Sequence, residues 1–158
     1  MKASYFSPDI KDFIFLLDKY KVKYLIVGGE AVIYYGHTRL TGDVDFFFNV
    51  VPENIKRLYD ALKEFWQGDI PGVDSIEDLK KPALIIQFGV PPNRIDLMNF
   101  IDNVSFSEAW KNKVTDKLRI YKKNVTIYFI GLDELIKNKE TINRPRDIED
   151  LKYLRKIK

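Results

Sequence analysis

The sequence contains no cysteine and only one histidine, His37. The absence of cysteine excludes disulfide bonds, cysteine-ligated zinc and a cysteine nucleophile. A single histidine excludes a metal site built from several histidines of one chain. Any metal site would therefore use oxygen ligands, and carboxylate oxygens favour magnesium or manganese.

Long hydrophobic runs are also missing. No stretch approaches the roughly 18 apolar residues of a membrane helix, and the N-terminus has no signal-peptide core. We therefore expect a cytoplasmic protein without a membrane segment. The net charge is +3 with no long basic block, so composition gives no argument for nucleic-acid binding. A chain of 158 residues with 46% hydrophobic content predicts a single domain, residues 1–158.

A pair of acidic residues marks the most informative stretch. Asp43 and Asp45 stand in the run DVDFFF, and side chains two residues apart point to the same side of a strand. Asp43, Asp45 and Phe47 would share one face, while the residues between and after them face the core. Two carboxylates on an apolar strand repel each other and lose hydration, which costs roughly several kcal/mol for each ion fully removed from water. A bound cation would remove this cost, so the pair indicates a metal site.

Two adjacent glycines, Gly28 and Gly29, follow the apolar run YLIV. Because they lack a Cβ atom, they allow the backbone to turn sharply and to approach a ligand closely. The residues after them predict a helix, whose first N–H groups and positive dipole end favour an anion. A phosphate at the glycine turn and a divalent cation at Asp43 and Asp45 would together form a nucleoside triphosphate site.

The spacing of these motifs resembles the signature of the DNA polymerase β-like nucleotidyltransferase superfamily. In that signature, an apolar residue and a glycine pair precede an apolar-flanked Asp-x-Asp by about a dozen residues. Here thirteen residues separate Gly29 from Asp43. The family also has a third acidic residue on a later strand, and Asp96 in the run RIDLM matches it, with Asp102 and Asp116 as alternatives.

The chain is most similar to a small bacterial branch of that superfamily, because it has the glycine pair and because Arg39 and Thr41 stand just before the aspartates. That branch includes abortive-infection nucleotidyltransferase toxins and lincosamide-modifying enzymes. The C-terminal run that contains Lys139, Arg144 and Asp147 is also similar to it.

The resemblance implies transfer of a nucleoside monophosphate from a triphosphate such as ATP to a hydroxyl group, with release of pyrophosphate. Asp43, Asp45 and Asp96 would hold Mg²⁺ or Mn²⁺ ions, and Asp96 would take the acceptor proton. The residues expected to bind the nucleotide are Gly28, Gly29, Arg39, Thr41 and Lys139. A solvated loop arginine and an ordinary turn threonine are the alternatives for Arg39 and Thr41. For Arg144 and Asp147 we favour a charged helix face with pairs three and four residues apart.

Apolar periodicity predicts an α+β fold, and the resemblance makes it a nucleotidyltransferase-like mixed sheet packed with helices. Residues 132–158 would form a small C-terminal helical element. Helices are expected at 7–21, 30–36, 52–66, 105–112, 132–139 and 145–157, with a short helical turn at 75–78. Strands are expected at 24–27, 43–48, 83–88, 94–100, 118–121 and 125–130, and the last four would form two hairpins.

The sequence does not identify the acceptor. A protein side chain, an RNA end and a small hydroxyl compound all stay open. The short stretch after Asp96 leaves room for only a small acceptor-binding element, which is consistent with a homo-oligomer that shares a cleft. The alternative function is a non-catalytic module that binds a nucleotide or a partner protein, such as one half of a toxin–antitoxin pair. A third interpretation is that the acidic residues are simply exposed.

Overall fold

The computed structural model describes residues 1 and 5–158, and its centre is a six-stranded mixed sheet with the order β3-β4-β2-β1-β6-β5. The strands are β1 (Tyr24–Val27), β2 (Asp43–Phe48), β3 (Ile85–Phe88), β4 (Arg94–Met98), β5 (Val114–Ile120) and β6 (Lys123–Phe129). The helices are α1 (Pro8–Lys19), α2 (Gly28–Tyr34), α3 (Pro52–Phe65), the 3-10 helix η2 (Ile76–Lys80), α4 (Phe106–Lys111), α5 (Leu132–Ile142) and α6 (Pro145–Ile157). The predicted α+β class is confirmed.

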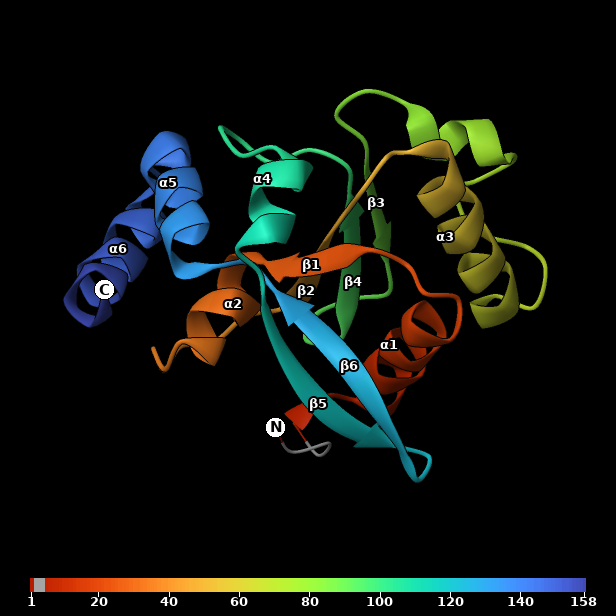
Figure 1. Ribbon diagram of the computed structural model, residues 1–158, viewed down its shortest axis with the longest axis horizontal. Helices are drawn as coiled ribbons and strands as arrows, with labels where there is room; N and C mark the ends of the chain where they lie inside the picture. The colour runs from red at the N-terminus through yellow and green to blue at the C-terminus, as the bar shows by residue number, and fades with distance from the viewer. Residues whose placement is uncertain (2–4) are drawn as a thin grey trace.

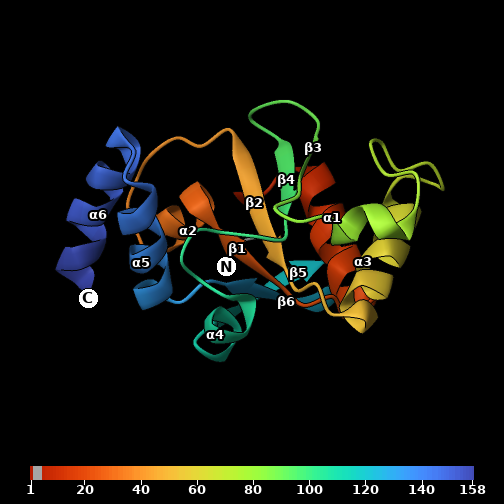
Figure 2. The same ribbon diagram turned by 90° about the horizontal axis from the view of Figure 1, so that it is seen from above.

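Helices cover both faces of the sheet and give the protein three layers (Figures 1 and 2). One core lies under α1 and α3 and receives Phe46 and Phe48 of β2. The second core lies under α2, α4, α5 and α6 and receives Phe47. In Figure 1, α1 and α3 lie to the right of the sheet and the α5–α6 pair lies to the left. All four residues of β1 are buried, because this strand is covered on both faces.

Local signals explain why the helices begin where they do. The Ser7 hydroxyl accepts the N–H of Ile10 at the start of α1, and a proline occupies the first turn of the helix, where its missing N–H costs nothing. At η2, the Asp78 side chain completes a capping box with Ser75. Helix α4 begins after Ser105, whose hydroxyl accepts the N–H of Glu108.

The pairing of β2 with β4 positions the acidic residues. These two strands run parallel, with Asp43 opposite Arg94 and Asp45 opposite Asp96. Because equivalent positions of paired strands face the same side, the three aspartates lie on the α2, α4, α5 and α6 face of the sheet. The predicted grouping of Asp43, Asp45 and Phe47 on one face is confirmed. Phe47 is nevertheless buried, so only the first half of this face is available to a ligand.

Several predicted boundaries are wrong. Helix α2 begins at Gly28 rather than after the glycine pair. Strand β3 begins at residue 85 rather than 83, because Ala83 has a positive φ of 52° that an extended strand cannot contain. Strand β4 ends at Met98, and Asn99 then turns its side chain to the backbone of Leu84 and Lys81.

The second hairpin is longer than predicted, and its turn lies one residue earlier. Residues 121 and 122 form the turn, with φ values of 51° and 63°, and Lys123 already belongs to β6. Strand β5 begins four residues before the predicted start. The prediction missed these residues because they alternate between half-buried and exposed positions and lack the apolar periodicity of a strand. Among the described residues, no helix combines the length and the apolar character that crossing a membrane requires.

Candidate active site

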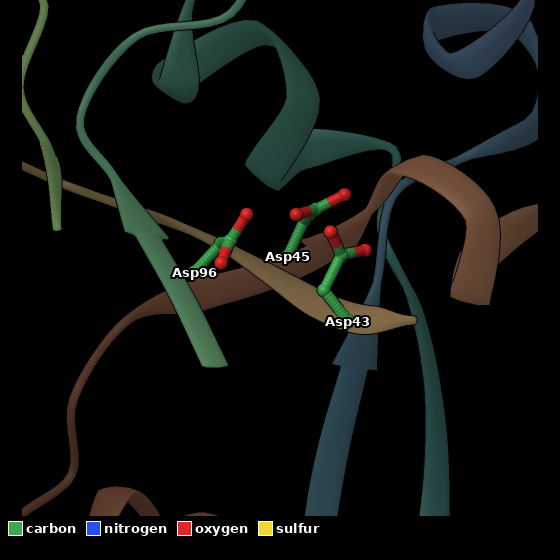
Figure 3. A group of neighbouring side chains, drawn as sticks. All are labelled: Asp43, Asp45 and Asp96. Carbon is green, nitrogen blue, oxygen red and sulfur yellow. The ribbon is translucent and has the colours of Figure 1, made fainter. Parts of the chain in front are cut away.

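Three aspartates converge at one end of the β2–β4 pair. Asp43, Asp45 and Asp96 each offer a carboxylate oxygen, and these oxygens lie within 4.8 Å of one another. Figure 3 shows the three carboxyl groups extending to the same side, two from β2 and one from β4. Asp96 is only 5% exposed, whereas Asp43 and Asp45 are half-buried. The expected third acidic residue is therefore next to the pair in space, although 51 positions separate it from Asp45 in the sequence.

The electrostatics of this aspartate cluster favour a cation. Burial raises the pKa of Asp45 to about 7, and the negative charges of Asp43 and Asp96 add to the rise. A carboxyl group with a raised pKa is one whose ionised form is poorly compensated by its surroundings. All the ligand atoms on offer are carboxylate oxygens, which suit a hard divalent ion such as Mg²⁺ or Mn²⁺. By both charge and ligand type, the three residues fit such an ion.

Gly28 leaves the space that Asp45 occupies. Its φ is +65°, a left-handed conformation that glycine adopts without strain. A Cβ atom at this position would lie 3.1 Å from Cγ of Asp45 and closer still to Oδ2. The first glycine of the pair is therefore required both for the turn into α2 and for the position of an acidic side chain.

Arg94 is a member of this site that the sequence predictions do not include. Its Nη2 atom donates to Asp43 Oδ2 at 2.7 Å and to Asp96 Oδ2 at 3.2 Å, and its Nε donates to Asp96 Oδ1 at 2.9 Å. The signal for it was the two-residue spacing from Asp96, which places both side chains on one face of β4. The hydrogen bond to Asp96 raises the pKa of Arg94 further above its usual value, so the guanidinium is charged.

A pocket of about 360 Å³ opens over the aspartates. Its walls combine three kinds of side chain. The carboxyl groups of the cluster lie beside Gly28 and Arg94, and the cationic Lys139 and Arg144 come from the C-terminal helices. The apolar part of the lining includes Ile85, Met98, Phe100, Ile101 and Ile142. Anionic and cationic groups thus share one cavity, as binding of a metal ion together with a phosphate would require.

Lys139 joins α5 to α6 through a buried ion-pair network. The side chain is 2% exposed, and its Nζ lies 3.0 Å from Asp147 Oδ1 and 2.9 Å from Asp150 Oδ2. Asp147 also accepts hydrogen bonds from the backbone and side chain of Arg144. The predicted pairing of Arg144 with Asp147 three residues apart is confirmed, but the predicted charged helix face is wrong for Asp147, which is fully buried.

Asp150 was not predicted, and it connects this network to the glycine turn. It is 1% exposed, and its Oδ1 atom lies 3.0 Å from Nε of Arg39. Asp150 and Asp147 share the core-facing stripe of α6 with Leu151 and Leu154, and this three- and four-residue spacing was the available signal. The acidic residues of α6 thus hold two cationic side chains that the sequence predicts to bind nucleotide.

The remaining predicted nucleotide-binding residues lie beside the pocket. A Cβ atom on Gly29 would lie 2.9 Å from both Arg39 Nη2 and Thr41 Oγ1, so these two side chains flank the glycine turn. The Thr41 hydroxyl also donates a hydrogen bond to the backbone carbonyl oxygen of Asp43 at 3.3 Å. Gly28 and Lys139 line the pocket itself, whereas Gly29, Arg39 and Thr41 lie outside its lining.

The alternatives for the third acidic residue lie elsewhere. Asp102 is exposed at the rim of the pocket and outside the aspartate cluster. Asp116 lies on β5, where it accepts a hydrogen bond from Tyr34. The only histidine of the sequence, His37, stacks on Tyr153 with 4.9 Å between the ring centroids.

Comparisons with known proteins identify a family for this chain and a solved structure with a shared fold. The family described as "Nucleotidyltransferase of unknown function (DUF6036)" matches residues 9–155. Among solved structures, the chain is similar to an antigenic nucleotidyltransferase-like protein from Paracoccidioides brasiliensis, with a TM-score of 0.52 and 18% sequence identity. That alignment covers 94% of this chain and 77% of the other, and it shows a shared fold. No curated protein matches the chain.

Replacement of Gly28 by alanine tests the close approach of the glycine turn to Asp45. Gly72 serves as a matched control, because it has a similar φ of +78° but nothing within 4 Å of an added Cβ. Both substitutions introduce the left-handed strain of about 1 kcal/mol. Only Gly28→Ala adds a clash, so we expect it to lower the free energy of unfolding by roughly 1–3 kcal/mol more than Gly72→Ala. Urea denaturation measures both values, and equal losses would contradict the proposed contact.

Replacement of Asp147 by asparagine tests the ion-pair network. Removal of one partner leaves a buried charge poorly compensated, so we expect the free energy of unfolding at pH 7 to fall by about 3 kcal/mol. The control is Glu149→Gln, because the side chain of Glu149 is 68% exposed and its pair with Lys152 is solvated. We expect the control to change stability by less than about 0.5 kcal/mol.

The difference in stability between the wild type and Asp147→Asn should depend on pH. Burial alone would raise the pKa of Asp147, but hydrogen bonds from Arg144 and Lys139 outweigh it and hold the pKa at about 2. The unfolded value is about 3.9, so the folded state binds the proton more weakly. The stability advantage of the wild type over Asp147→Asn should therefore be complete above about pH 5 and shrink progressively as the pH falls through about 2. An advantage that does not change over this range would exclude an ionised Asp147 as its cause.

Proposed function

The chain belongs to the family described as nucleotidyltransferase of unknown function, and on this premise we propose that it is a metal-dependent nucleotidyltransferase. It would transfer a nucleoside monophosphate from a nucleoside triphosphate to a hydroxyl group. The observation that carries the proposal is the convergence of Asp43, Asp45 and Asp96 beside the turn at Gly28. The proposal treats residues 1–158 as one domain in which α5 and α6 are the C-terminal part.

The aspartates would hold the divalent ions. Mg²⁺ or Mn²⁺ held by these residues would neutralise charge on the phosphate groups and favour attack by a hydroxyl oxygen. In the reaction, a bond forms between the acceptor oxygen and the α-phosphorus, and the bond from this phosphorus to the bridging oxygen breaks. Pyrophosphate leaves with the electron pair of that bond. One carboxylate oxygen of Asp96 would take the acceptor proton once Arg94 has released it.

The cationic residues would orient the triphosphate. Lys139 and Arg144 line the same pocket as the aspartates, and their positive charges would attract phosphate groups. Arg39 and Thr41 lie at the glycine turn and would complete the phosphate contacts there, together with Gly28 and Gly29. Asp150 keeps Arg39 and Lys139 in place, so that little order has to be gained when the nucleotide binds.

The acceptor and the particular branch of the superfamily stay predictions. The pocket holds about 360 Å³ and has an exposed apolar rim at Ile85 and Phe100. A protein side chain, an RNA end and a small hydroxyl compound are compatible with such a rim. The similarity to abortive-infection toxins and to lincosamide-modifying enzymes rests on the motifs of the sequence alone.

A thermal-shift panel tests metal and nucleotide binding. Mg²⁺ with ATP, CTP, GTP or UTP should raise the melting temperature by about 5–10 °C for at least one triphosphate, because ligand at 100 times its Kd adds about 2.7 kcal/mol. The rise should disappear in Asp43→Asn and in Asp45→Asn. It should persist in Asp69→Asn, which makes the same charge change in an exposed loop. Stabilisation that persists in both site variants would contradict the proposed metal ligands.

Label transfer separates an enzyme from a binding module. We expect incubation with α-labelled triphosphates, Mg²⁺ and a cell lysate to label one lysate component with the wild type but none with Asp96→Asn. Wild-type protein that is stabilised by Mg²⁺ and nucleotide, yet transfers no label in several lysates, would favour the non-catalytic nucleotide-binding module instead.

A further inference from the structure

Arg94 places a permanent positive charge inside the aspartate cluster. It is paired with Asp43 across the β2–β4 register and stands two residues before Asp96, so all three side chains share one face of the sheet. Its guanidinium bridges the two carboxylates, with hydrogen bonds of 2.7, 2.9 and 3.2 Å. Bridging contacts of this kind between a guanidinium and carboxylates are among the stronger hydrogen bonds of proteins.

The carboxylate oxygens of Asp43 and Asp96 that would bind a cation already accept hydrogen bonds from neighbouring side chains. Both oxygens of Asp96 accept from Arg94, and Oδ2 also accepts from Gln87 at 3.3 Å. Asp43 accepts from Arg94 at Oδ2, and the Thr41 hydroxyl lies 3.4 Å from its Oδ1 and shares its one hydrogen with the Asp43 carbonyl. A divalent ion at Asp96 would therefore share its ligand oxygens with a charged donor, and the two positive charges would repel each other.

Asp45 is compensated differently from its neighbours. Among the ion pairs of the described residues, those of Arg94 reach Asp43 and Asp96 but not Asp45. Three carboxylates and one guanidinium leave a formal charge of minus two when all are ionised, which a single divalent ion would balance. The cluster is thus partly neutralised before any ion binds.

Taking the proposed function as its basis, we propose that Arg94 is a resident counter-ion that competes with the divalent cation for Asp43 and Asp96. Binding of the ion would then require the guanidinium to leave at least one of these carboxylates. The side chain has room to do so, because it is 28% exposed and lines the pocket. Arg94 would thus set how tightly the nucleotide-free protein binds metal, and it would keep the carboxylates close together while no ion is present.

Direct titration with Mn²⁺ in the absence of nucleotide tests this competition. Calorimetry or the free-Mn²⁺ electron paramagnetic resonance signal gives the Kd. We expect Arg94→Gln, which removes the charge, to bind Mn²⁺ roughly tenfold more tightly than the wild type, or better. Arg94→Lys keeps the charge but loses the fork of donors, so its Kd should lie between those two values. Arg119→Gln removes an exposed arginine on the distant hairpin and should leave the Kd unchanged.

The outcomes separate this inference from the proposed function. If the wild type binds Mn²⁺ and Asp45→Asn does not, the metal site stands. Equal or weaker binding by Arg94→Gln then overturns the competition and makes Arg94 a residue that holds the carboxylates in place for the ion. Absence of Mn²⁺ binding in the wild type and in every variant would overturn the metal site and the competition together. Should Arg94→Gln fail to fold, Arg94→Lys decides, and binding no tighter than that of the wild type would overturn the inference.

Discussion

The in-register parallel pairing of β2 with β4 is the constraint on which the rest of the site depends. It places Asp45 beside Asp96 and Asp43 beside Arg94 on one face of the sheet. Three carboxylates so close to one another are mutually repulsive, and burial strengthens that repulsion. Two features make the arrangement tolerable: the guanidinium of Arg94 compensates two of the acidic residues, and the missing side chain of Gly28 gives the third its space.

The C-terminal helices form part of the site rather than an appendage. Lys139 on α5 and Asp150 on α6 are both buried, and Asp150 reaches Arg39 in the loop before β2. This chain of ion pairs links the end of the polypeptide to the glycine turn. A buried charge without its partner is strongly unfavourable, so the packing of α6 and the placement of the cationic side chains depend on each other.

Much of this arrangement was predictable from local patterns. The alternation in β2 placed Asp43 and Asp45 on one face, and the resemblance to the nucleotidyltransferase superfamily pointed to Asp96 as the third acidic residue. Arg94 was not predicted, although its spacing from Asp96 was visible, because its second partner, Asp43, is apparent only once β4 is known to pair with β2. Asp147 was wrongly predicted to be solvated. A charged residue in an amphipathic helix is usually exposed, and the sequence does not show that Lys139 pairs with it across the helix interface. The extent of β5 was missed because its first half lacks the apolar signal of a strand.

The order in which the cluster is assembled has a consequence for synthesis of the chain. Arg94 and Asp43 are 51 positions apart, and α3, η2 and β3 are made between them. Contacts so distant in sequence close large loops and tend to form slowly. A nascent chain that ends before β4 carries two of the three aspartates and neither Arg94 nor Lys139. An incomplete product released early from the ribosome would therefore lack the assembled centre, so any chemistry performed there is confined to the finished, folded molecule.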